Sequence, residues 1–255
     1  MTADHVPRAA RRVAGDWRVL SSRTERPAAF DPSMVADLPA AARRWLTHAV
    51  APGTPLWRTV ELSMRGEIRI GTWRPFTARQ VLAPPRGLVW AATARLYGLP
   101  VTGFDRFSSG SGEMRWRLGG LVPLLSASGP DVTRSAAGRL AGEATLLPTA
   151  FRSATWTPGS AEDRVVATWH VSGQDERVEL QVGPDGRLLG AEMDRWGNPG
   201  GAPFGRHRFG VAFEAERTSA GVTIGSVLRA GWWWGTDRQA EGEFFRARIT
   251  GATFR

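Results

Sequence analysis

Strict alternation of apolar and polar residues over eleven positions is the feature that most constrains the fold. Between Val60 and Ile70 the even positions are apolar or glycine, and the odd positions are charged or serine. A period of two is typical of a β-strand with one buried and one solvated face. The same alternation recurs at residues 113–118, 177–182 and 209–215. A sheet with so many half-buried strands has to close on itself or wrap something.

Turn and capping signals divide the chain into strands and two helices. One helix is predicted to start at Asp37-Leu38-Pro39, and a second to start near Gly129 and stop at Pro148. Strands are predicted at 57–70, 74–82, 88–97 and 112–118 and again from 155 onward, with hairpin turns at 184–186 and 219–221.

These elements predict a mainly β (α+β) fold. We expect a single curled antiparallel sheet of about ten strands that forms a barrel or half-barrel around a cavity, with two helices covering or plugging it. Residues 33–255 are expected to form this single β-barrel domain, and residues 1–32 a loosely ordered N-terminal extension.

Composition excludes several classes of partner. The formal charge is +9, but all 33 basic residues are arginine, which indicates a GC-rich source such as an actinobacterium. Because the arginines are spread along solvent-facing strand positions, they favour a basic surface over a nucleic-acid site. The chain has no cysteine, and its four histidines never occur at ligand spacing, so no metal site is expected.

Motifs for nucleotide cofactors and covalent catalysis are missing as well. Gly110-Ser111-Gly112 opens a strand rather than a helix, and a phosphate-binding loop lacks its lysine. We therefore expect no cofactor. The first 23 residues contain five arginines and no apolar run of signal-peptide or membrane-span length. The sequence predicts a cytoplasmic protein, monomeric or homodimeric, without stable membrane insertion.

Five motifs resemble those of an uncharacterised bacterial family of unknown function, and the resemblance extends from about Leu38 to the C-terminus. They are Trp73-Arg74-Pro75-Phe76-Thr77-Ala78-Arg79-Gln80, Pro85-Arg86-Gly87-Leu88-Val89-Trp90, Leu99-Pro100-Val101-Thr102-Gly103-Phe104-Asp105, Gly110-Ser111-Gly112-Glu113-Met114 and Leu140-Ala141-Gly142-Glu143. The resemblance implies a shape similar to lipoprotein-carrier and lipocalin-like barrels, but no settled activity. The sequence departs from the family pattern in two respects: Leu146 stands where an aromatic residue is expected, and the membrane segments of other members are missing. These departures predict a member that functions as a soluble protein.

Aromatic residues are the main candidates for ligand contact. The chain has twelve tryptophans and a single tyrosine. Core packing is the ordinary role of any one tryptophan, but together they supply more ring area than a packed barrel needs. Rigid rings on the inner face predict a pocket for a large apolar ligand. The predicted ligand-binding residues are Trp73, Phe76, Trp90, Trp116, Met193 and Trp196.

The residues predicted to be catalytic are Glu143, Tyr97 and Arg195, the last as partner of Glu143 or as a clamp on a ligand carbonyl. Glu143 shares the apolar face of the second helix with Leu140, so it is either paired with an inward arginine such as Arg195 or protonated and able to donate a proton. Tyr97 is either a hydrogen-bond donor or a strand anchor. Asp105 and Glu113 flank a serine- and glycine-rich segment that runs from Arg106 to Gly112. Asp105, Arg106 and Glu113 are expected to belong to a mobile lid there, or simply to be solvated.

Two functions of different class follow. The first is a cofactor-free cyclase or isomerase that closes a ring, by a cycloaddition-type reaction, in a polyketide-like substrate of natural-product biosynthesis. The alternative is a non-catalytic carrier of a lipid or another hydrophobic small molecule. A third reading is a basic scaffold for acidic partners, whose binding would be sensitive to salt. Removal of Glu143 or Tyr97 is expected to slow a cyclase and to leave a carrier nearly unchanged.

Overall fold

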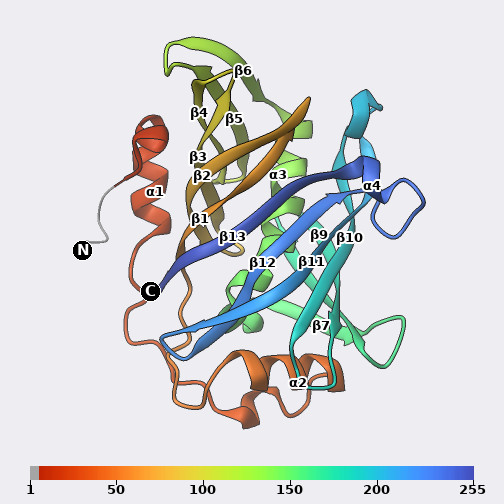
Figure 1. Cartoon of the computed structure of the whole chain (residues 1–255). Helices are drawn as coiled ribbons and strands as arrows, with labels where there is room; N and C mark the ends of the chain where they lie inside the picture. Colours follow the sequence, from red (N-terminus) through yellow and green to blue (C-terminus); the bar gives the residue numbers. More distant parts are fainter. Residues whose placement is uncertain (1–5) are drawn as a thin grey trace.

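The computed structural model describes residues 6–255 and contains one antiparallel sheet that curls into a half-barrel (Figure 1). Its thirteen strands lie in the order β6-β5-β4-β3-β2-β1-β13-β12-β11-β10-β9-β8-β7. Each strand pairs with its neighbours in sequence, except that β6 and β7 form the two open edges. The pairing of β1 with β13, here called the β1–β13 closure, joins the two halves of the sheet. The mainly β, curled-sheet prediction is confirmed.

The strands of the first half are β1 (Val60–Ile70), β2 (Thr72–Ala83), β3 (Gly87–Leu96), β4 (Leu99–Ser108), β5 (Ser111–Leu118) and β6 (Val122–Ser128). Those of the second half are β7 (Ala154–Pro158), β8 (Arg164–Val171), β9 (Gln174–Val182), β10 (Leu188–Gly197), β11 (Gly205–Ser219), β12 (Val222–Trp232) and β13 (Glu243–Phe254). The helices are α1 (Ala14–Leu20), α2 (Ala40–Ala49), α3 (Pro130–Glu143) and α4 (Gln239–Gly242), with short 3-10 turns η1 (Arg8–Val13), η2 (Pro32–Val35), η3 (Ala144–Leu146), η4 (Pro148–Ser153) and η5 (Pro199–Gly201).

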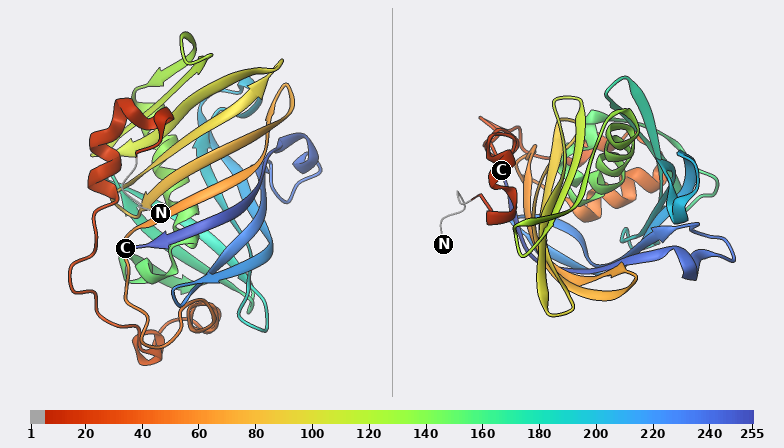
Figure 2. Two further views of the ribbon diagram at one scale, coloured as in Figure 1. Left: turned by 60° about the vertical axis from the view of Figure 1, so that its left-hand side comes forward. Right: turned by 90° about the horizontal axis from the view of Figure 1, so that it is seen from above.

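Helix α3 fills the hollow of the curl. It contacts β4, β5 and β6 on one side and β8, β9 and β10 on the other, so it bridges the two open ends of the sheet (Figure 2). The inward residues of the strands pack around it, among them Leu62, Leu88 and Leu180, which are buried in one large core. The predicted plugging role of the second helix is therefore confirmed.

Helix α2 covers the opposite end of the half-barrel from the β5–β6 hairpin (Figure 1). Its apolar face, which includes Trp45 and Leu46, is buried in the same core. The ring centroids of Trp45 and Trp156 lie 6.0 Å apart, which ties the helix to β7. This end of the molecule is thus closed by packed side chains.

The N-terminal segment differs from the expected loose order. Helix α1 and the turn η1 lie on the outer face of β2, β3 and β4, where they build a second, smaller core. Trp17 and Leu20 are buried there against Val89 and Phe104. An apolar stripe at helical spacing, including Val13, provides this face. The domain boundary at residue 33 stays a prediction.

The segment 106–112 is not a loop. Strands β4 and β5 continue through it and are joined at Ser109 and Gly110, whose φ angles of 50° and 70° are typical of a tight hairpin turn. Arg106 is held by Glu113 at 3.2 Å and by Asp16 of α1 at 3.6 Å. The lid expected of Asp105, Arg106 and Glu113 is therefore wrong, because all three lie in paired strands.

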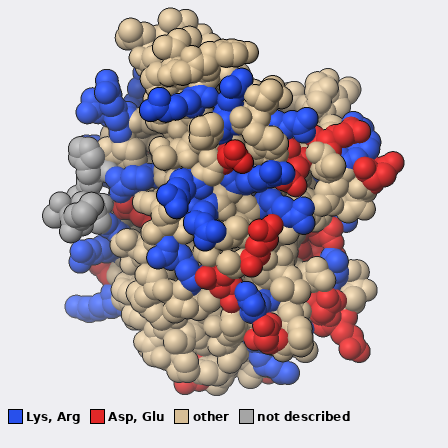
Figure 3. Space-filling model, viewed as in Figure 1, with Lys and Arg blue, Asp and Glu red and all other residues tan. Residues whose placement is uncertain are grey.

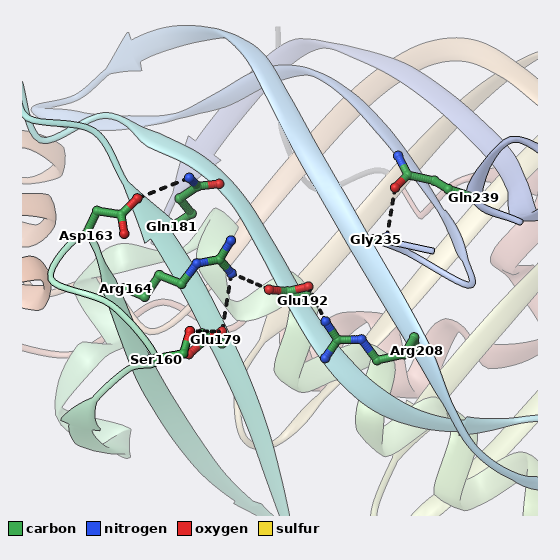
Figure 4. A network of polar contacts seen from close by, with 9 residues as sticks. All are labelled: Ser160, Asp163, Arg164, Glu179, Gln181, Glu192, Arg208, Gly235 and Gln239. Atoms are coloured by element: carbon green, nitrogen blue, oxygen red, sulfur yellow. Dashed lines mark hydrogen bonds and ion pairs between the residues drawn. The ribbon is translucent and has the colours of Figure 1, made fainter. Parts of the chain in front are cut away.

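The outer face of β8 to β11 carries a network of charged side chains (Figure 4). Arg164 bridges Glu192 and Glu179, the latter at 3.3 Å, and Arg208 lies 2.6 Å from Glu192. Burial raises the pKa of Glu179, but hydrogen bonds from Ser160 and the Arg164 charge outweigh it and lower the pKa. These ion pairs connect neighbouring strands from β8 to β11 and favour their observed register.

Replacing Glu192 with glutamine is expected to lower the free energy of unfolding by about 1 kcal/mol, because two arginines lose their shared anion. The loss should shrink in high salt, which screens exposed charges. Denaturant unfolding at two salt concentrations measures it, with Glu162→Gln on the exposed surface as control. An equal loss in both variants would contradict the role of the network.

Candidate functional site

Aromatic rings from four strands meet on the concave face. The ring centroids of Phe76 and Trp90 are 5.7 Å apart, and those of Trp90 and Trp116 are 5.6 Å apart. Phe245 of β13 stacks on Phe76 at 5.1 Å. The sequence predicted three of these rings as ligand contacts. It missed Phe245, whose place beside them depends on the β1–β13 closure.

A half-buried ion cluster borders the aromatic rings. Arg139 of α3 lies 2.8 Å from Asp105 Oδ2 and 2.7 Å from Glu143 Oε1, and its guanidinium carbon is 5.2 Å from the Trp90 ring centroid. Gln80 donates a hydrogen bond to Glu143, and Trp116 Nε1 donates one to Asp105 at 2.9 Å. The cluster joins α3 to β2, β4 and β5.

Burial and ion pairing both shift pKa values in this cluster. Burial raises the pKa of Asp105, and this outweighs the opposing effects of Arg139 and of the Trp116 hydrogen bond. Burial lowers the pKa of Arg139, but Glu143 and Asp105 more than reverse this, so the pKa is raised and the guanidinium stays charged. The carboxyl that burial makes more basic is thus Asp105. One interpretation of the sequence paired Glu143 with Arg195. In the structure the arginine that pairs with Glu143 is instead Arg139 of the same helix, at 2.7 Å.

Arg195 of β10 is a half-buried cation that forms no ion pair within residues 6–255. Its guanidinium carbon lies 4.9 Å from the Phe209 ring centroid and 5.2 Å from that of Trp232. It donates to the backbone oxygen of Ser135 at 3.2–3.3 Å, and no carboxylate of residues 6–255 forms an ion pair with it. Burial and the nearby Arg139 charge lower its pKa to about 10, so it is protonated at neutral pH.

Several buried N–H groups also lack acceptors in the described part of the chain. They are Trp57 Nε1, Arg74 Nε, Trp90 Nε1, Arg134 Nε and Arg217 Nε. The Trp90 indole belongs to the aromatic cluster, and Trp90 is only 3% exposed. Buried donors are normally satisfied by protein or water, so the Trp90 N–H is a donor to which an acceptor can be added.

Other predicted residues lie elsewhere. Tyr97 sits at the β3–β4 turn and is 83% exposed, with the Arg74 guanidinium 5.0 Å from its ring centroid. Trp73 lies on the outer face, where Arg246 stacks 4.3 Å from its ring centroid. Neither residue lines the interior.

The two remaining candidates flank α3. Trp196 donates a hydrogen bond to Asp131 at 3.0 Å, and Arg134 stacks 3.7 Å from its ring centroid, so it marks the beginning of the helix. Met193 is buried beside Gly138 and Gly142. A Cβ added to either glycine would lie 3.6 Å from Met193, which shows how closely the helix approaches β10.

A groove of about 500 Å³ lies on the convex side, not in the interior. Its walls come from β1, β11, β12 and β13 and are rich in charge. Glu243 pairs there with Arg246 at 2.6 Å and with Arg229 at 3.5 Å. Because the charged side chains of this groove pair with one another, the groove is a poor site for an apolar ligand.

The protein is thus a curled antiparallel half-barrel filled by one helix. Its concave face carries a cluster of aromatic rings and the Arg195 guanidinium. The chain belongs to a family of unknown function (DUF6544), whose model matches residues 28–244. The predicted resemblance to an uncharacterised family is confirmed. No curated protein matches the chain.

Two solved structures are similar in fold. One is an outer membrane lipoprotein-sorting protein domain from Vibrio parahaemolyticus, with 9% identity, a TM-score of 0.44, and coverage of 78% of this chain and 86% of that one. The other is a LolA superfamily protein from Nitrosomonas europaea, with 11% identity, a TM-score of 0.47, and coverage of 86% and 94%. At these identities the likeness concerns the fold alone. Among residues 6–255, no helix has the length and apolarity needed to cross a membrane. The cytoplasmic location stays a prediction.

Proposed function

We propose that the protein binds and carries a hydrophobic molecule with an acidic head group, held between the concave face of the sheet and α3. The observation that carries this proposal is Arg195, a half-buried cation between Phe209 and Trp232 without an ion-pair partner among the described residues. A partly desolvated guanidinium without an ion pair gains when an anionic group binds directly to it. A ligand carboxylate or phosphate is such a group.

The aromatic cluster suits the apolar part of such a ligand. Phe76, Trp90 and Trp116 present rigid rings on the same concave face as Arg195, and the free Trp90 N–H offers a donor. Apolar walls with a few placed polar groups are typical of small-molecule sites. The head would meet Arg195 and the tail would lie along the rings.

Helix α3 is the element that would move away from the sheet to admit the ligand. Its buried residues are Ala137, Gly138, Leu140 and Ala141, so only one large apolar side chain anchors it. Burying such small side chains stabilises a helix far less than burying a row of leucines. The chain after α3 is anchored more firmly by the buried Leu147 and Phe151. We therefore place the opening at the start of α3 and the hinge near η3.

Ring-closing catalysis has less support than carriage. The two proton donors that it was expected to use are unsuited to that task, because Tyr97 is exposed at a turn and Glu143 is held by Arg139 and Gln80. Native mass spectrometry of the purified protein tests the choice. Carriage predicts a co-purified acidic amphiphile that is released unchanged, and a cyclised product would favour the cyclase instead.

Replacing Arg195 with glutamine is expected to weaken the binding of a dansyl-labelled fatty acid at least tenfold, since a charge-assisted contact is lost. The methyl ester of the same probe should bind the wild type and the variant equally. Fluorescence titration measures both, circular dichroism checks the fold, and Arg152→Gln on the exposed surface is the control. Equal affinity of the wild type for the acid and the ester would contradict the acidic-head proposal.

A further inference from the structure

Exposed apolar side chains gather at one end of the half-barrel. The tips of the β1–β2, β3–β4 and β5–β6 hairpins all lie at this end, opposite α2 (Figure 1). Tyr97 is 83% exposed and Leu121 is 78% exposed. The members of this apolar rim are Ile70, Tyr97, Leu99, Leu121, Val122, Leu124 and Leu125. Large apolar side chains exposed together at one end of a molecule favour an interaction site there.

The outermost tip is held in shape rather than loose. Gly119 donates its N–H to the Pro100 oxygen at 2.7 Å, and Leu121 donates to Leu118 at 3.1 Å. Arg117 Nη1 donates to the Leu121 oxygen at 3.3 Å. The tip therefore presents Leu121, and the β6 leucines that follow it, from a fixed backbone.

A strongly basic hollow lies directly beside this tip. It has a volume of about 260 Å³ and lies between η1 and the outer face of β4 and β5. We call it the arginine hollow, and its charged lining residues are Arg8, Arg11, Arg12, Arg115 and Arg117. None of the described residues that line it is acidic, although Arg115 also pairs with Glu113. Gly119 and Gly120 of the tip complete its wall, and Figure 3 shows basic side chains directly below the uncharged tip.

We propose that this end of the molecule docks onto a lipid bilayer surface rich in anionic head groups. Leucine and tyrosine on hairpin tips would enter the interfacial layer, and the arginine hollow would hold a lipid phosphate. The arrangement complements an anionic bilayer in both respects, since the rim is apolar and the adjoining hollow is positive. The tip protrudes, which suits a deformable lipid layer. This proposal does not depend on the interior ligand site.

Vesicle flotation tests the proposal. The wild type is expected to float with mixed phosphatidylcholine/phosphatidylglycerol vesicles and to stay in solution with phosphatidylcholine alone, and high salt should release it. Replacing Arg11 and Arg12 with glutamine should weaken binding about fivefold for each arginine removed. Replacing Leu121 and Leu124 with serine should weaken it at least tenfold.

Matched substitutions at the other end of the molecule serve as controls. Arg152→Gln and Leu189→Ser remove an exposed arginine and an exposed leucine near the α2 end, and both should float like the wild type. The proposal is overturned if the wild type does not bind anionic vesicles, or if rim and control variants bind equally. It is also overturned if the rim variants only convert a dimer to a monomer in sedimentation velocity, which would make the rim an interface between copies.

Discussion

Replacing Arg139 with methionine is expected to lower the free energy of unfolding by about 3 kcal/mol at neutral pH, because Asp105 and Glu143 are left without their cation. Methionine keeps most of the side-chain volume, so the loss is mainly electrostatic. The two carboxyls have side-chain exposures of only 17% and 25%, and water replaces the guanidinium poorly at such sites. Urea unfolding followed by tryptophan fluorescence measures the change.

The deficit of the Arg139 variant should shrink as the pH falls. Burial already raises the pKa of Asp105 above its unfolded value of 3.8, and Arg139 is the largest influence that lowers it. Without Arg139 the folded pKa rises further, so the folded state holds this proton more tightly than the unfolded chain. Stability is then lost as the pH rises from 3.8 through the folded pKa. Arg152→Met is the control, and a deficit that is constant with pH would contradict the assignment.

Alternation of apolar and polar residues identifies much of the interior of the half-barrel. Phe76, Trp90 and Trp116 share the concave face. Trp73 stands three residues before Phe76 in the same strand, so the two side chains point to opposite faces. The period of two alone therefore excluded Trp73 from the interior. Tyr97 precedes Gly98 at a turn, where both φ angles are positive.

Two further features had signals in the sequence. Arg139 stands four residues before Glu143 in the predicted helix, a spacing that favours an ion pair on one helix face. The stripe that includes Val13 and Trp17 at helical spacing marked the N-terminal helix.

The rest depends on the curl of the sheet and could not be predicted. Asp105 meets Arg139 only because α3 lies inside the half-barrel, thirty-four positions along the chain. Arg195 meets Ser135 sixty positions away for the same reason. Local patterns fix which face a residue occupies, but the radius of curvature decides which faces meet across the interior. The rim was missed because its residues lie at strand ends and in β6, where alternation does not show whether another element covers the side chains.

Replacing Gly112 with alanine is expected to lower the free energy of unfolding by about 2–3 kcal/mol, because β5 touches the first turn of α3 there. A Cβ at this position would lie 2.7 Å from Thr133 Cα and 2.8 Å from the Val132 oxygen, both backbone atoms that cannot turn aside. The Gly112 N–H also donates to Thr133 Oγ1 at 3.0 Å, and a displaced helix would lose this bond. Thermal and urea unfolding measure the loss.

Gly15→Ala is the matched control for this wedge. Nothing lies within 4 Å of a Cβ at Gly15, and alanine is favoured in the helix, so a stability gain of up to about 1 kcal/mol is expected. If the start of α3 is the part that opens for a ligand, the Gly112 variant should also bind the dansyl-labelled fatty acid faster than the wild type in stopped-flow mixing. A destabilised variant with an unchanged association rate would place the opening elsewhere, since the wedge acts only on the contact between β5 and the first turn of α3.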